Sequence, residues 1–199
     1  MCNGFVFQLQ VSILKKNRMR KIILLACLLQ VSIGFAQKKK LVAPSNEPLK
    51  TESMKMLDGG YEQYKQVAMQ IWNHAELGYK EVKSTALLQE TLKKEGFTVE
   101  AGVADIPTAF VATYGSGQPV IGILAEFDAL PGLAQQAVPE KKTIEGKAGG
   151  HACGHHLFGA ASVAAGISIK KLIEEKKLKG TIKVFGCPAE EGGSGKVYM

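Results

Sequence analysis

The 199-residue sequence has only four cysteines, Cys2, Cys27, Cys153 and Cys187. This scarcity excludes a disulfide-rich scaffold, and no two of the cysteines have the Cys-x-x-Cys spacing of a thioredoxin-like redox site. Cys153 and Cys187, the two beyond residue 50, could still form one disulfide in an exported protein.

The chain also lacks a surplus of basic residues outside its N-terminal quarter. Residues 1–50 carry nine lysines or arginines and one acid, so the remaining 149 residues have a net charge of −1 although the whole chain has +7. A basic surface for nucleic acid is therefore not indicated. The hydrophobic fraction of 46% and the charged fraction of 22% are typical of a globular domain.

The N-terminal charges precede a short apolar stretch. From Met19 the chain reads MRKIILLACLLQVSIGFAQKKK, with two positive charges before the apolar residues 22–35 and small residues up to Ala36. This pattern predicts a secretory leader over residues 1–36, with Met19 as the true start, and an exported protein, periplasmic or extracellular. The stretch is too short for a stable membrane span. The alternative, a lipoprotein anchored at Cys27, would leave an apolar core of only about five residues.

Apolar periodicity predicts the order of the elements that follow. Residues 37–58 are polar and predict a linker, so we expect ordered structure from residue 59 onward. Helical spacing and apolar runs predict three helices and four strands, with the helices over 61–75, 82–92 and 157–177 and the strands over 97–101, 108–114, 120–125 and 181–187. Helices alternating with strands predict an α/β layer fold with a largely covered sheet.

Three polar clusters fall at element ends, where an α/β sheet binds ligands. AEFDALPG (125–132) follows one predicted strand, PAEEGG (188–193) follows another, and GGHACGHH (149–156) leads into the long predicted helix. We therefore expect the three clusters to meet at one crevice. Taken singly, each has a structural explanation: a solvated glutamate pair, a turn-forming aspartate, or buried histidines and a buried thiol.

Together the clusters predict a metal hydrolase. Cys153 and His155 are two residues apart on a glycine-rich loop, so both can reach one ion. Glu190 and Glu191 are adjacent, so one can bind metal while the other acts as a base toward water. Asp128 can hold the free N–H of a histidine ligand and fix its tautomer.

The same segments resemble a known family. AEFDALPG, GHACGHHLFGAA and FGCPAEEGGSGKVYM are similar, in order and spacing, to the signature segments of the metal-dependent amidohydrolase branch of the aminoacylase/carboxypeptidase (zinc peptidase) superfamily. WNHAELGYKE (72–81) is similar to a further segment of these proteins, with Ala75 where proline is usual. The resemblance runs from about Gly60 to Met199 and is greatest to the aminobenzoyl-glutamate hydrolase type.

The resemblance implies roles for individual residues. Cys153, His155 and Glu191 would be ligands of a site for two divalent ions, zinc or manganese. Glu190 would be the general base that takes a proton from the attacking water, and Asp128 the supporting acid behind the site. The implied reaction is hydrolysis of the amide bond of N-acyl or aryl amino acids such as p-aminobenzoyl-glutamate.

The chain departs from the family pattern at two positions. His156 stands where Asp or Asn is usual, and we expect it, like His151, to lie beside the ligands rather than among them. Cys187 stands where a polar residue is more common. With Cys153 it could form an inhibitory disulfide in an oxidising compartment.

The resemblance also implies an architecture and a size. The expected fold is a three-layer sheet flanked by helices, with residues 59–199 as the N-terminal part of the catalytic domain and the C-terminal half and lid absent. We therefore expect a fragment with little activity of its own, and a homodimer for the full-length protein. The alternatives are a broad N-acyl-amino-acid amidohydrolase or dipeptidase, and a non-catalytic metal-binding homologue. Retention of Glu190 argues against the last.

Overall fold

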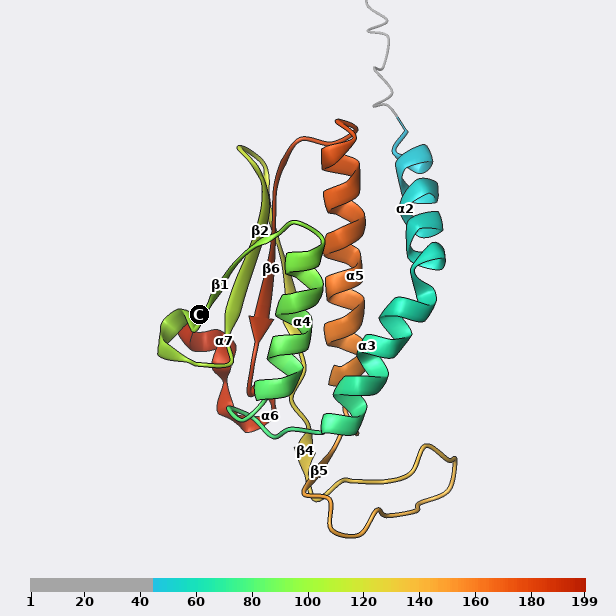
Figure 1. Cartoon of the computed structure of the whole chain (residues 1–199), viewed down its shortest axis with the longest axis vertical. Helices are drawn as coiled ribbons and strands as arrows, with labels where there is room; N and C mark the ends of the chain where they lie inside the picture. The colour runs from blue at the N-terminus through green and yellow to red at the C-terminus, as the bar shows by residue number, and fades with distance from the viewer. Residues whose placement is uncertain (1–44) are drawn as a thin grey trace, which may run out of the picture. The chain divides into compact units, whose positions relative to one another are not determined.

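The computed structural model describes residues 45–199, of which residues from Asn46 onward form one compact unit (Figure 1). The predicted leader and the first part of the predicted linker lie outside the described residues. The helices are α2 (Glu47–Gly59), α3 (Tyr61–His74), α4 (Val82–Lys94), α5 (His155–Glu174), α6 (Glu190–Gly193) and α7 (Gly195–Tyr198). The strands are β1 (Thr98–Ala101), β2 (Phe110–Ser116), β3 (Val120–Glu126), β4 (Leu130–Pro131), β5 (Gly149–Gly150) and β6 (Gly180–Cys187).

The main sheet is mixed, which confirms the predicted α/β class. Its strand order is β1-β2-β6-β3, with β1 and β6 both antiparallel to β2, and β3 parallel to β6. In the parallel pair Val120 lies opposite Thr181 and Glu126 lies opposite Cys187. The segments that leave β3 and β6 at their carboxyl ends therefore start side by side.

One apolar core joins the sheet to its helices. Burial alternates along β6, so that Ile182 and Val184 face inward. They share a core cluster with Leu88 of α4 and Ile167 of α5. These helices thus cover one face of the sheet, and within residues 45–199 two of the three predicted layers are present.

Helix α5 is the central element of this core. Among the described residues it alone is long and apolar enough to cross a membrane by length and composition, a property that buried core helices share. Val163 and Ile167 in α5 are fully buried. Its apolar composition is accounted for by packing against the sheet and against α3 and α4.

The linker prediction is wrong for residues 47–58. These residues form helix α2, so ordered structure begins before Gly60. Pro48 lies in the first turn, where proline is compatible with a helix. The hydroxyls of Ser53 and Ser168 are 2.7 Å apart and tie α2 to α5. A polar helix stabilised by contacts with a distant helix has only a weak signal in its own sequence.

The long connection between β3 and α5 is closed by a two-stranded sheet. In it β4 pairs antiparallel with β5, Leu130 opposite Gly150 and Pro131 opposite Gly149. This pairing brings the chain that follows Asp128 beside the chain that precedes Cys153. Two of the three polar clusters are thus joined by backbone hydrogen bonds.

Candidate metal centre

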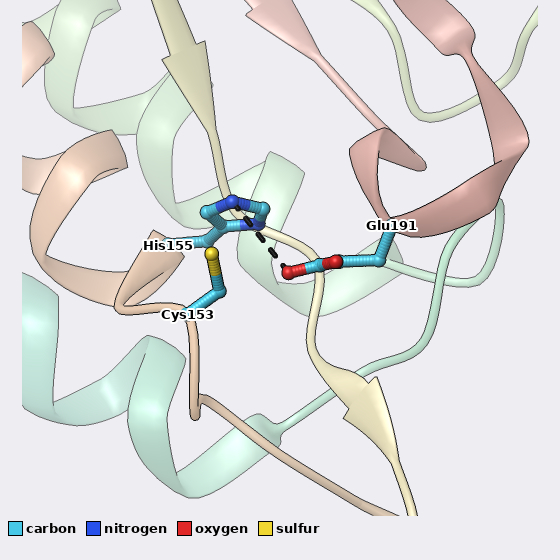
Figure 2. Close-up of side chains that lie close together, drawn as sticks. All are labelled: Cys153, His155 and Glu191. Carbon is cyan, nitrogen blue, oxygen red and sulfur yellow. Dashed lines mark ion pairs between the residues drawn. The ribbon is translucent and has the colours of Figure 1, made fainter.

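Cys153, His155 and Glu191 come together as one potential ligand group. Each offers one donor atom, and the three atoms lie within 4.8 Å of one another. Figure 2 shows the three side chains pointing toward one another, Cys153 from the loop before α5, His155 from the first residue of α5 and Glu191 from the opposite side. Gly154 between the first two has φ +84°, a left-handed conformation that favours glycine and turns the loop into α5. The helix begins at His155, two residues earlier than predicted.

A second group overlaps the first and includes a residue that sequence reasoning missed. Glu126, His155 and Glu190 also offer donor atoms within 4.8 Å of one another. The carboxylate of Glu126 lies 3.1 Å from His155 Nε2, and that of Glu190 lies 3.8 Å from it. Glu126 ends β3 two residues before Asp128, and this period-two spacing was the available signal. Lys196 of α7 forms an ion pair with Glu126.

Asp128 forms hydrogen bonds with residues of the two other polar clusters, His155 and Glu191. Its side chain is buried, with 1% of the residue exposed. Oδ1 accepts a hydrogen bond from His155 Nδ1 at 2.9 Å, and Oδ2 accepts one from the backbone N–H of Glu191 at 2.9 Å. Because Nδ1 carries the proton toward Asp128, Nε2 is the nitrogen available to a metal.

The charges of these residues are coupled. Burial raises the pKa of Asp128, but the hydrogen bonds from His155 and the Glu191 N–H outweigh it, so the pKa is lowered overall. The hydrogen bond to Asp128 raises the pKa of His155, and the nearby carboxylates add to the rise. Hydrogen bonding to Glu191 raises the pKa of the exposed Cys153 thiol, so metal binding must displace its proton.

The residues fit a divalent cation. Glu191 Oε1 is buried and has no hydrogen-bond partner among the described residues, so it is available to bind a cation. A sulfur, an imidazole nitrogen and a carboxylate oxygen form a donor set suited to zinc-like ions. His155 belongs to both groups, so among the described residues the two groups share one imidazole.

His151 and His156 lie outside both ligand groups. Their rings are 5.1 Å apart, and the ring of Trp72 lies 4.9 Å from that of His156. His151 Nε2 donates to the backbone oxygen of Ile71 at 3.0 Å. Burial lowers the pKa of His151 to about 4 and also lowers that of His156, so both rings are neutral near pH 7.

The two cysteines beyond residue 50 are free thiols. Cys153 is exposed at the ligand group, whereas Cys187 is buried at the end of β6. The disulfide that the sequence allowed is not formed in this structure.

Comparison with known proteins finds relatives for most of the described residues. The model of peptidase family M20/M25/M40 matches residues 122–199, which include all the ligand candidates. One of the subunits of p-aminobenzoyl-glutamate hydrolase from Escherichia coli K12 is 44% identical over 144 residues, 72% of this chain and 30% of that protein. The thermostable carboxypeptidase 2 of Saccharolobus solfataricus is 36% identical over 131 residues, 64% of this chain and 32% of that protein.

A solved structure shares the fold. A dinuclear metal-binding peptidase of the M20 family from Bacillus subtilis superimposes with a TM-score of 0.60 at 25% identity, over 71% of this chain and 39% of that one. The chain thus spans about a third of the length of these relatives. Residues 122–199 thus match peptidase family M20/M25/M40 in sequence, and the described chain has the fold of a solved member of that family.

Proposed function

We propose that the protein hydrolyses the amide bond of N-acyl or aryl amino acids, such as p-aminobenzoyl-glutamate, in a metal-dependent reaction. The observation that carries the proposal is the cluster of Cys153, His155 and Glu191 within 4.8 Å, with Glu190 beside it. The identity of 44% to a protein of p-aminobenzoyl-glutamate hydrolysis supports this substrate class.

Each residue has a distinct task in this reaction. Two divalent ions, zinc or manganese, would polarise the amide carbonyl and acidify a water molecule when bound. Cys153, His155 and Glu191 would hold one of them, and Asp128 keeps His155 in the tautomer that presents Nε2. Glu190, whose side chain is 40% exposed, would take the proton of the attacking water and pass it to the leaving amine.

We further propose that residues 1–199 alone have little activity. Two ions need two sets of ligands, but the two groups in the described residues share His155. The relatives are about three times longer than the matched region, and their remaining length is the natural source of further ligands. A homodimeric whole protein and export through the N-terminal leader are proposals that rest on the family resemblance and on the sequence of residues 19–36.

A peptide substrate is the second candidate. The 36% identity to a carboxypeptidase favours it, since peptide and acyl-amino-acid bonds are both amides. A non-catalytic metal-binding role is disfavoured by Glu190, which a binding protein would not need.

The test is release of p-aminobenzoate from p-aminobenzoyl-glutamate, compared with release of amino acids from dipeptides and other N-acyl amino acids. We expect hydrolysis by the protein encoded by the whole gene, loss of activity with a chelator, and recovery with zinc or manganese. The 199-residue chain should be far less active. Undiminished hydrolysis after the metal is removed would contradict the proposal.

A further inference from the structure

We propose that Glu81 is a positioning residue that holds Glu190 and Glu191 in place through the backbone N–H of Ala189. The proposal deepens the proposed function, because Glu190 and Glu191 carry its base and one of its ligands. The hydrogen bonds from which it is argued join protein residues directly and do not depend on a bound metal ion.

Glu81 is a buried acid that accepts a hydrogen bond from the segment of the glutamate pair. It lies directly before α4, is 0% exposed, and its Oε1 accepts a hydrogen bond from the Ala189 N–H at 2.8 Å. Burial raises the pKa of Glu81, and hydrogen bonds that include those from the Ala189 N–H and the Thr108 hydroxyl offset only part of that rise. Burial of a carboxyl group is costly unless the group is paired, so a fully buried acid needs a partner such as the Ala189 N–H.

Ala189 needs such an anchor. It has φ 54° and ψ 44°, a left-handed conformation that costs a non-glycine residue about 1 kcal/mol or more. This turn is what directs the chain from the end of β6 into Glu190. Without the acceptor at Glu81, the Ala189 N–H would be buried and unpaired, and the strained turn would lose a restraint.

The segment that carries Glu81 also contacts the other side of the site. The backbone oxygen of Glu76 accepts a hydrogen bond from the Ala129 N–H at 2.8 Å. Tyr79 Oη donates to the backbone oxygen of Gly193, beyond the glutamate pair. Residues 76–81 therefore touch the chain just after Asp128 and the chain on both sides of Glu190 and Glu191.

Glu191 is consequently held from two directions. Its own N–H is fixed by Asp128, and the residue two positions earlier is fixed by Glu81. Loss of one anchor should let the glutamate pair move relative to His155 while the core, which Glu81 does not join, stays intact.

Glu76 provides a matched control. It belongs to the same segment, but its carboxylate accepts hydrogen bonds only from the start of α4, from Lys83 N–H at 3.0 Å and from Ser84 N–H at 2.9 Å. Replacing it weakens a helix cap without touching Ala189. Glu81→Gln is the conservative variant, because the amide oxygen of glutamine can still accept a hydrogen bond from the Ala189 N–H. Burial raises the pKa of Glu81 and so favours its neutral form, which the neutral glutamine resembles.

The first experiment is amide hydrogen exchange in the metal-free 199-residue chain, with rates normalised to core amides of β6 in the same variant. Glu81→Met, which fills the space without an acceptor, should speed exchange at Ala189 and Glu191 about tenfold. Glu81→Gln should stay within about threefold of the parent, and Glu76→Ala should leave both amides unchanged. If Glu81→Met does not fold, Glu81→Ala takes its place. Unchanged exchange at Glu191, or equal changes in the Glu76 variant, would overturn the proposal.

The second experiment is a cobalt titration followed by the absorption of the cobalt–thiolate bond. Glu81→Met should weaken cobalt binding about tenfold or more, as loss of an outer partner of a metal site does, and Glu81→Gln should restore it. If the parent chain bound no cobalt, the proposed function would fail, whereas the exchange result would still decide the role of Glu81.

Discussion

Replacement of Asp128 by asparagine should remove a pH-dependent part of the stability of the metal-free chain. The Asp128 carboxylate accepts from His155 Nδ1 and from the Glu191 N–H, each at 2.9 Å. An asparagine side chain has one oxygen, so only one of the two donors keeps its acceptor. The loss of a buried hydrogen bond to a charged group is about 2 kcal/mol.

The pH window follows from the two pKa shifts. The pKa of Asp128 is lowered by folding, so its contribution is full above the unfolded value of about 4 and is lost as pH falls through the folded value. The pKa of His155 is raised, so its contribution is full below about pH 6.5 and is lost as pH rises through the folded value. Asp128 and His155 therefore both contribute fully to the stability of the folded chain between about pH 4 and 6.5.

Urea unfolding with chelator present, measured across this pH range, gives the test. With an m-value of about 2 kcal/mol per molar, the midpoint of Asp128→Asn should fall by about 1 M near pH 5.5 and by less at pH 8. Glu62→Gln, a substitution at a carboxylate that is 71% exposed and belongs to neither ligand group, should keep the pH profile of the parent. Parallel profiles for Asp128→Asn and the parent would refute the coupling between Asp128 and His155.

Three further predictions have defined outcomes. Cys153→Ala should lower the metal retained after dialysis, and equal metal content by elemental analysis would remove Cys153 from the ligands. In the whole protein, the Glu190→Gln variant should keep its metal while kcat for amide hydrolysis falls by about 10²–10⁴. A kcat within a few-fold of the parent would show that Glu190 is not the general base. Ile167→Ala, at a fully buried position of α5, should cost about 2–5 kcal/mol in thermal or urea unfolding, whereas Leu157→Ala, at a position 60% exposed, should cost far less.

Much of the fold was predictable from local pattern. The helix over 61–75 and the strand over 181–187 agree with α3 and β6 to within a residue, because their apolar periodicity is strong. The meeting of the clusters after β3 and β6 followed from topology, since neighbouring parallel strands end at one edge. Helix α2 was missed because contacts with α5 stabilise it, and its own residues are mostly polar.

The site was predictable only where the residue types were distinctive. Cys153 and His155 stand out by chemistry, and the adjacent glutamates stand out as a pair. Glu126 and Glu81 do not, because an acid at a strand end or a helix start is ordinary in a sequence. The hydrogen bond from Ala189 to Glu81 joins residues 108 positions apart. Only the folded chain shows that this acid contacts the segment that leads into Glu190 and Glu191.

The most direct test of the metal centre is X-ray absorption at the zinc edge of the zinc-loaded 199-residue chain. The account predicts one sulfur neighbour at about 2.3 Å, from Cys153, together with nitrogen and oxygen neighbours at about 2.0–2.2 Å. Cys153→Ala should remove the sulfur shell. A zinc ion with only nitrogen and oxygen neighbours in the parent chain would contradict the assignment of Cys153, His155 and Glu191 as one ligand set.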